Sequence, residues 1–294
     1  MRLSVIIPTR DRAEMLVGCL ETLSGQNIDE IIVIDDGSSD ETSQVAVRYG
    51  ARCITQLPSG LNVARNNGAA QATGDILAFV DDDIYADTDW AAHLREVFEH
   101  TRCDAVGGKI VLKFEAPKPK WLHQKLYIQL SGQDFGDELR PMANYEIPLG
   151  ANCAVTRSAF EKVNGFVEGL DREGSSLLSN GDKDFFMRLH GEGALIMYSP
   201  LAWVTHRVPE SRLNKRWFRR RTWFQGVGDA MLKFDPGDVA RKGKVHQTLR
   251  EVRRLGRALP ILLSNVLAGN GALSAQLWVL YCLGRIAGIH RSVK

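Results

Sequence analysis

Short apolar runs alternate with helix-like stretches from the N-terminus to about residue 105. The runs are continuous and rich in β-branched residues, which is typical of strands buried on both faces. The expected strands are Leu3–Ile7, Ile31–Ile34, Arg52–Gln56 and Ile76–Val80, and the expected helices are Ala13–Leu23, Glu41–Tyr49 and Asn62–Ala72. This alternation predicts an α/β domain with a mostly parallel central sheet covered by helices on both faces.

Three of the expected strands end in polar clusters. PTRDR follows the first strand, DDGSSD follows the second, and DDD follows the fourth. Ligands of parallel α/β sheets bind at the carboxyl ends of the strands. We therefore expect the three clusters to converge on one crevice.

The alternation weakens after residue 105, and Ile128–Glu146 is expected to be rich in loops. A strand is expected at Asp104–Phe114, and PLGANCAVTRSAFEKVNGF predicts a further strand and a short helix. A helix is expected at Lys183–His190, and two more are expected at Lys244–Leu267 and Gly271–His290.

Charge is divided unevenly along the 294 residues, whose net charge is +2. Residues 1–206 carry 19 Lys/Arg and 30 Asp/Glu, whereas residues 207–294 carry 18 and 5. A basic tail on an acidic body suggests an anionic partner for the tail, such as phosphate groups or a lipid surface. The acidic body and the lack of a recognition motif argue against nucleic acid.

The two C-terminal helical blocks leave two interpretations open. Arg250, Arg253, Arg254 and Arg257 form a basic face on the first block, and the mostly apolar second block contains Arg285. A spanning helix usually lacks a deeply placed arginine. The pair is therefore expected either to lie on an anionic membrane surface or to pack on the body.

Cysteine usage and the N-terminus indicate a reducing compartment. The five cysteines are scattered and include no CxxC, which argues against a disulfide framework or a zinc site. The N-terminus has too short an apolar run for a secretory signal. We expect a cytoplasmic protein, with peripheral attachment to the inner face of the membrane as the alternative.

Asp81, Asp82 and Asp83 follow a buried strand, and adjacent carboxylates repel one another, so a cation should lie nearby. Aspartate is also common in turns after strands. The interpretation we favour is a site for Mg²⁺ or Mn²⁺, which carboxylates bind while positions stay open for phosphate oxygens. Side chains alternate along an extended chain, so Asp81 and Asp83 can share a face while Asp82 points elsewhere.

The segments VIIPTRDR, VIDDGSSDET, GLNVARNNGAAQATGDILAFVDDD and NGDKDFFMRL resemble the inverting family-2 glycosyltransferases in order and spacing, over roughly residues 1–230. The resemblance implies a glycosyltransferase-A fold. Its Rossmann-like nucleotide-sugar-binding half would be 1–105 and its acceptor-binding half 106–230, followed by a basic and apolar helical extension at 231–294. It also implies transfer of one sugar from a nucleoside diphosphate donor, with Mg²⁺ or Mn²⁺ as cofactor.

The resemblance implies a set of donor-binding residues. They are Pro8, Arg10, Asp36, Arg65, Asp81, Asp82, Arg220 and Arg221. Pro8 and Arg10 would lie in the first nucleotide-contacting loop, Asp36 would bind the base, and Asp81 or Asp82 would face the ribose. Asp83 would coordinate the metal, and His206 would complete the metal shell or touch the diphosphate; a structural histidine is the alternative.

On the acceptor side, Asp182 matches the family's catalytic base and Asp184 its second acidic position. Gly150 and Asn152 are implied to lie near the reaction centre. Gly181 stands where the family commonly has a glutamate, and this departure puts an acceptor or helix-end contact in doubt. Asp182 could instead cap the following helix, as aspartate often does.

The basic segment RLNKRWFRRRTWFQG follows His206. It could form an exposed helix face, or Arg220 or Arg221 could reach the departing diphosphate while the interleaved aromatic residues pack a loop over the sugar. The segment lacks the Gln-x-x-Arg-Trp of processive synthases, which favours transfer of a single sugar.

The favoured function is an inverting glycosyltransferase of cell-envelope synthesis, acting on a glycan, lipid-linked or small-molecule acceptor. One alternative is a nucleotide-sugar-binding protein with impaired catalysis, for which Gly181 is the best support. A sugar nucleotidyltransferase is less favoured, because PTRDRAE lacks the glycines of a phosphate loop.

Overall fold

The computed structural model describes residues 1–172, 176–232, 244–267 and 272–291, without the side chains of residues 245, 257–267 and 272. The chain divides into two compact units. The first unit comprises Met1–Val167 and Asp182–Pro209, and the second comprises Glu168–Gly181 and Glu210–Lys294.

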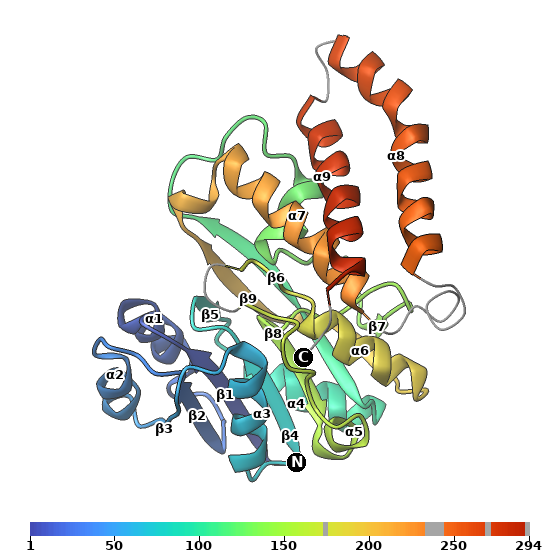
Figure 1. The fold of residues 1–294 in the computed structure, drawn as a ribbon. Helices are drawn as coiled ribbons and strands as arrows, with labels where there is room; N and C mark the ends of the chain where they lie inside the picture. The colour runs from blue at the N-terminus through green and yellow to red at the C-terminus, as the bar shows by residue number, and fades with distance from the viewer. Residues whose placement is uncertain (173–175, 233–243, 268–271, 292–294) are drawn as a thin grey trace. The chain divides into compact units, whose positions relative to one another are not determined.

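The first unit is built on one mixed sheet, which has nine strands in the part of the chain that the structure describes (Figure 1). The strands are β1 (Leu3–Thr9), β2 (Glu30–Asp35), β3 (Arg52–Thr55), β4 (Ile76–Val80), β5 (Ile84–Ala86), β6 (Ala105–Phe114), β7 (Arg140–Pro141), β8 (Asn152–Thr156) and β9 (Ile196–Val208). Their order is β3-β2-β1-β4-β8-β6-β9-β5, and β7 pairs with β9. Strands β1 to β4 run parallel to their neighbours among themselves, whereas β8 is antiparallel to both β4 and β6.

Helices cover both faces of this sheet. They are α1 (Ala13–Leu23), α2 (Thr42–Arg48), α3 (Leu61–Gln71), α4 (Trp90–Thr101), α5 (Arg157–Lys162) and α6 (Gly181–Gly191), with a 3₁₀ helix at Gln124–Leu130. The apolar side chains of α1, α2 and α4 pack with Val5 and Ile7 of β1, and those of α3, α5 and α6 pack with Ile6. Successive side chains of a strand point to opposite faces, so a sheet buried on both sides requires the continuous apolar runs of the sequence.

The strands and helices expected before residue 80 are confirmed, with ends that differ by one or two residues. Before β6, two elements were not predicted. Strand β5 has three residues, which is too short for a recognisable period, and it starts directly after the aspartates. Helix α4 buries Trp90, Ala91, Leu94, Val97 and Phe98, and this helical spacing was readable in the sequence.

The second unit contains helices α7 (Lys215–Met231), α8 (Lys244–Leu267) and α9 (Ala272–Ile289), after a 3₁₀ turn at Glu210–Arg212. The two expected tail helices are confirmed. The basic segment forms α7 and is not the loop over the sugar that we considered. Its helical start is stabilised by Asn214, whose side chain accepts a hydrogen bond from the backbone N–H of Trp217 at 2.9 Å.

Glycines bring α7 and α9 into backbone contact. A Cβ at Gly226 would collide with the carbonyl oxygen of Tyr281, and a Cβ at Gly284 would collide with that of Trp223. Helix axes approach this closely only where side chains are absent from the interface. Glycine in a helix interior is otherwise unfavourable, so these positions are explained by packing.

Polar side chains inside the second unit join its three helices. Glu251 of α8 is fully buried and accepts a hydrogen bond from Arg285 of α9 at 3.0 Å. Tyr281 of α9 donates to Asp229 of α7 at 2.7 Å. Arg285 therefore has a carboxylate partner inside the unit, and α9 packs against both α7 and α8. The Arg257 side chain of the expected basic face lies outside the described residues.

Among the described residues, no helix combines the length and apolarity required to cross a membrane.

The contact between α7 and α9 predicts the effect of adding a single methyl group. We expect Gly284→Ala to lower the free energy of unfolding by about 1–3 kcal/mol, because the methyl group would push the helices apart. Gly256→Ala in α8 is the matched control: a Cβ there meets nothing within 4 Å, and the change should stabilise the helix by up to about 1 kcal/mol. Urea denaturation measures both changes, and a Gly284→Ala protein as stable as the wild type would contradict the packing.

Candidate active site

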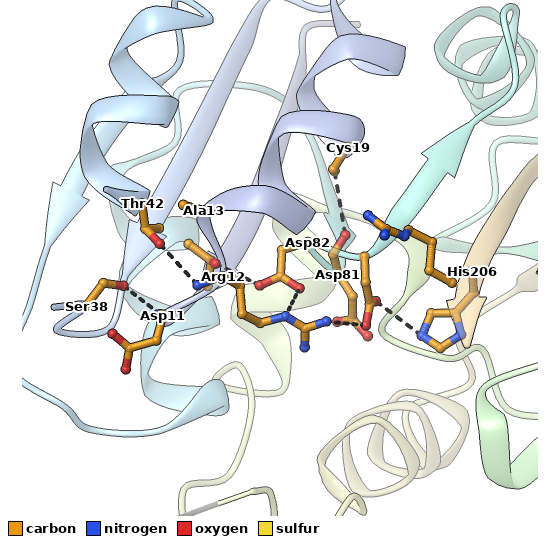
Figure 2. A network of polar contacts seen from close by, with 12 residues as sticks. Asp11, Arg12, Ala13, Cys19, Ser38, Thr42, Asp81, Asp82 and His206 are labelled. Atoms are coloured by element: carbon orange, nitrogen blue, oxygen red, sulfur yellow. Dashed lines mark hydrogen bonds and ion pairs between the residues drawn. The ribbon is translucent and has the colours of Figure 1, made fainter. Parts of the chain in front are cut away.

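Three aspartates lie directly after β4, and an arginine from the segment after β1 neutralises two of them. The parallel pairing of β1 and β4 brings Thr9 next to Asp82, and its hydroxyl donates to that carboxylate at 2.7 Å. Arg12 then spans the pair: its Nε lies 3.1 Å from Asp82 Oδ1, and its Nη2 lies 2.7 Å from Asp83 Oδ2 (Figure 2). Arg12 is therefore the cation that these two carboxylates require.

Burial and the charge of Arg12 shift the pKa of Asp82 in opposite directions. Burial raises the pKa of Asp82, and the nearby positive charge of Arg12 opposes that change. Desolvation lowers the pKa of Arg12, but the negative charges of Asp82 and Asp83 outweigh it and leave that pKa above its ordinary value. Arg12 stays protonated, and its charge limits the cost of burying two adjacent carboxylates.

A second arginine, Arg65 of α3, joins Asp81 to Asp182. The Arg65 guanidinium is 2% exposed; its Nη2 lies 3.2 Å from Asp81 Oδ1 and its Nη1 lies 2.7 Å from Asp182 Oδ1. The other oxygen of Asp182 accepts a hydrogen bond from the backbone N–H of Gly150 at 2.8 Å. A side chain at position 150 would collide with the Arg65 guanidinium, so this contact requires glycine. The carboxylates after β4 and at the start of α6 thus belong to one cluster.

The contacts of Asp182 also bear on the capping alternative. Asp182 lies in the first turn of α6, which begins at Gly181. In the described part of the chain, its carboxylate accepts hydrogen bonds from Arg65 and Gly150, which belong to other segments. These contacts favour a role in the cluster over a role as helix cap.

His206 approaches the aspartates from β9. Residues Ile84 and His206 are paired neighbours in the antiparallel contact of β5 with β9. The imidazole Nε2 lies 3.2 Å from Asp83 Oδ1 (Figure 2). One ligand atom each of Asp81, Asp83 and His206 all lie within 4.8 Å of one another. Two carboxylates and an imidazole fit a divalent ion and suit Mn²⁺ better than Mg²⁺.

Asp36 lies at the end of β2 and holds the segment that leads into α3. Its Oδ1 accepts hydrogen bonds from the Gln56 side chain and the Ser59 backbone, both at 2.8 Å, and its Oδ2 accepts one from the backbone of Gly60 at 3.0 Å. A carboxylate can accept about four hydrogen bonds. Asp36 therefore retains capacity for one further donor.

The loop after β1 contains two of the expected donor residues. Pro8 is buried within β1, whereas Arg10 is half exposed and lies 3.6 Å from the Asp11 carboxylate. Arg12, two residues further on, was not predicted to be a site residue. The available signal was the adjacency of two strands that both end in charged clusters, since adjacent parallel strands bring the residues that follow them together.

Asn152 is fully buried at the start of β8, and interior groups use all its side-chain hydrogen-bonding atoms. Its Oδ1 accepts from the Trp90 indole at 2.9 Å, and its Nδ2 donates to the carbonyl oxygens of Ala202 at 2.8 Å and Lys109 at 3.1 Å. These contacts connect β8 to α4, β6 and β9, so the side chain of Asn152 helps to hold these elements together.

Asp184 is also buried, and it forms an ion pair within α6. Its Oδ2 accepts from Arg188 Nε at 2.8 Å. Arg188 in turn donates to the carbonyl oxygens of Val163 and Gly165. The pair fixes the segment after α5 against α6.

Arg220 and Arg221 belong to α7 in the second unit. The Arg220 guanidinium lies 5.9 Å from the centre of the Phe224 ring. Arg221 is buried, and desolvation lowers its pKa to about 10. Its Nη1 has no hydrogen-bond partner among the described residues. Burial without a hydrogen bond is costly for such a group.

The chain shares sequence with known proteins. Residues 4–163 match the family model described as glycosyl transferase family 2. A protein of Haloferax volcanii named glucosyl-dolichyl phosphate glucuronosyltransferase is 26% identical over 79% of this chain and 77% of its own length. A protein of Rhizobium meliloti named succinoglycan biosynthesis protein ExoM is 31% identical over 73% of this chain and 70% of its own length.

Solved structures share its architecture. The mannosyltransferase PcManGT from Pyrobaculum calidifontis, solved with GDP-Man and Mn²⁺, matches with a TM-score of 0.61 and 16% identity over 99% of this chain and 88% of that chain. Residues 1–349 of TarS from S. aureus, solved with UDP-GlcNAc, match with a TM-score of 0.58 and 17% identity over 98% and 89%. These matches confirm the expected fold class, a mixed α/β glycosyltransferase-A sheet followed by a helical C-terminal region.

The position of Arg65 predicts coupling between two of its partners. We expect Arg65→Met to lower the free energy of unfolding by about 3 kcal/mol, because Asp81 and Asp182 would lose the cation that joins them. In an Asp182→Asn background, the cost of Arg65→Met should fall by at least about 1 kcal/mol. Urea denaturation of the four proteins measures this coupling.

The control for this double-mutant cycle is Arg52→Met. It removes an exposed arginine on β3 and should change the free energy of unfolding little. Additive effects of Arg65→Met and Asp182→Asn, within about 0.5 kcal/mol, would contradict the contact.

Proposed function

Because the chain belongs to glycosyl transferase family 2, we propose that it transfers one sugar, with inversion, from a nucleoside diphosphate donor to an acceptor hydroxyl with the aid of Mg²⁺ or Mn²⁺. The main support for this proposal is the arrangement of the candidate residues. The candidate metal ligands Asp81, Asp83 and His206 and the candidate base Asp182 lie in one unit, and Arg65 links Asp81 to Asp182. The GDP-Man, UDP-GlcNAc and Mn²⁺ bound to the structural neighbours support the proposed ligands.

The metal would be held by Asp83 and His206, with Asp81 within reach. A divalent ion held there would supply positive charge against the negative charge that grows on the diphosphate as the sugar–phosphate bond breaks, and would so favour the transition state over the ground state. His206 is buried, and the contact of its Nε2 with Asp83 fixes the ring against that carboxylate. The donor set favours Mn²⁺ over Mg²⁺.

The remaining donor contacts follow from the exposure of each residue. Asp36 would accept a hydrogen bond from the base through its remaining acceptor position. Of the two candidates for the ribose, Asp81 is the better supported, since it is 29% exposed whereas Asp82 is buried and bonded to Thr9 and Arg12. Pro8 and Arg10 would shape the nucleotide loop.

Positive charge on the donor side would come from arginines. Arg65 would lie near the nucleotide, where its link to Asp81 holds the ribose-facing carboxylate. Arg220 and Arg221, as the family resemblance implies, are the candidates in the second unit for binding a diphosphate. The buried Arg221 Nη1, which lacks a hydrogen-bond partner among the described residues, supports this role because an anion would satisfy it.

Asp182 would act as the general base. The acceptor hydroxyl gives its proton to this carboxylate while its oxygen attacks the anomeric carbon and the diphosphate leaves. Arg65 and the Gly150 amide each bind one Asp182 oxygen and so fix its orientation. Gly150 thereby serves the acceptor side through its backbone, and Asp184 through the ion pair that steadies α6.

Replacing the base tests the proposed chemistry. Asp182→Asn removes the proton acceptor and keeps the shape of the side chain, so we expect turnover to fall about 10²–10⁴-fold. Donor nucleotide binding should change little. Asp137→Asn is the control, because that carboxylate is 92% exposed and should be replaceable without loss of turnover. Release of the nucleoside diphosphate measures turnover, and calorimetry measures binding.

A turnover that is unchanged in Asp182→Asn would contradict the role of Asp182. A wild-type protein that binds nucleoside diphosphates and shows no turnover with any acceptor would favour the alternative, a nucleotide-sugar-binding protein, to which Gly181 in place of the usual glutamate points.

The acceptor would belong to the cell envelope, and the second unit would attach to the cytoplasmic face of an anionic membrane. On α8, Leu249 and Val252 are each 50% exposed, whereas Glu251 is buried. The exposed Arg253 lies four residues after Leu249, on the same face of the helix as that leucine. Apolar side chains flanked by arginine are typical of helices that bind anionic lipid surfaces.

The outward face of α8 predicts the effect of polar substitutions. Vesicles that contain phosphatidylglycerol should carry the wild type in a flotation assay, and Leu249→Ser with Val252→Ser should reduce the bound fraction several-fold by removing apolar contact area. Val47→Ser is the control, because Val47 is 66% exposed on α2 in the acidic first unit. Equal flotation of wild type and double variant would contradict this surface.

A further inference from the structure

Arg12 occupies a position that the comparisons and the family resemblance leave without a role. It comes from the segment between β1 and α1, and it contacts Asp82 at 3.1 Å and Asp83 at 2.7 Å. Its side chain is 30% exposed, whereas the two carboxylates are almost fully buried. Arg12 is therefore a partly exposed cation in contact with two buried carboxylates.

Asp83 is shared between two neighbours through different oxygens. Its Oδ2 contacts Arg12, and its Oδ1 lies 3.2 Å from His206 Nε2. The oxygen on the His206 side is the one that the proposed metal would use with that imidazole. A divalent ion bound there would share the Asp83 carboxylate with a guanidinium, and the two positive charges would repel each other.

We propose that Arg12 is a positioning residue and a built-in counter-cation: it holds Asp82 and Asp83 in place before metal binds, and it lowers the affinity of the site for a divalent ion. This inference rests on the proposed metal-dependent function. Without Arg12, two adjacent buried carboxylates would repel each other and attract any available cation.

Loss of a counter-cation and loss of a purely structural residue at position 12 have different expected effects. Loss of a structural residue would disorder the carboxylates and weaken both folding and metal binding. Loss of a counter-cation would destabilise the metal-free protein and strengthen metal binding. Stability and metal affinity therefore change in opposite directions only under the proposal.

The same contacts have a consequence for the donor. A metal ion added beside Arg12 leaves an excess of positive charge, and a diphosphate brings negative charge that removes the excess. The metal should thus bind more tightly together with the diphosphate than alone. Release of the diphosphate would restore the repulsion and help the ion to leave.

The experiment measures Mn²⁺ binding by the loss of the free-ion EPR signal, on the full chain with Mn²⁺ alone as the probe. We expect Arg12→Gln to bind Mn²⁺ about ten-fold more tightly than the wild type, because one repelling charge is gone. In EDTA, the same variant should unfold roughly 2–4 °C lower, because two adjacent buried carboxylates lose their counter-cation. Arg12→Lys keeps the charge and loses the paired contact, so its affinity should lie between the two.

Arg52→Gln is the matched control for the loss of one arginine, and it should leave both measurements unchanged because Arg52 contacts Gln71 at the sheet edge. Equal or weaker Mn²⁺ binding by Arg12→Gln, with clear binding by the wild type, would overturn the role of Arg12 alone. Binding by Arg12→Lys that is weaker than wild type would also overturn it, and this variant decides the matter if Arg12→Gln does not fold. No Mn²⁺ binding by either the wild type or Arg12→Gln, with or without a nucleoside diphosphate, would overturn the proposed metal site itself.

Discussion

Compensation of negative charge at the carboxyl end of β4 is the constraint on which the candidate site depends. The chain holds Asp81, Asp82 and Asp83 next to one another, so cationic side chains from other segments must compensate their negative charge. Arg12 spans Asp82 and Asp83, and Arg65 spans Asp81 and Asp182. Each arginine joins two carboxylates, so the pairs connect β4 to the segment after β1, to α3 and to α6. The contacts of Arg12 and Arg65 that compensate the negative charges also bring together the residues of the proposed donor site and the proposed base.

Much of the first unit could be predicted because the relevant signals are local. Continuous apolar runs identified β1, β2 and β4, and the order of the polar clusters after them indicated a shared site. The partners of buried polar side chains could not be predicted in this way. Asn152 is an example: Trp90, Lys109 and Ala202 bind its side chain inside the protein. Such contacts depend on how β6 pairs antiparallel with β8 and parallel with β9, and no spacing in the sequence records that.

The second unit shows the same division between local and long-range signals. Periodicity predicted α8 and α9, but the two interpretations of their charge could not be separated from the sequence. In the structure, Arg285 pairs with the buried Glu251, so this arginine serves the packing of α9. Gly226 and Gly284 let α7 and α9 touch through their backbones. Packing of α9 leaves one face of α8 exposed, and internal packing is thus compatible with the proposed attachment to a membrane.

We propose that carboxylates from distant parts of the chain gather around one divalent ion and the diphosphate it binds. An anomalous difference map of crystals grown with Mn²⁺ and a nucleoside diphosphate would locate that ion. We expect one strong peak in contact with Asp83 and His206, with the diphosphate bound to the same ion and Asp182 facing the sugar side. A map without that peak, or with Mn²⁺ only at another group such as Asp87, Asp89 and His93, would rule out this metal site.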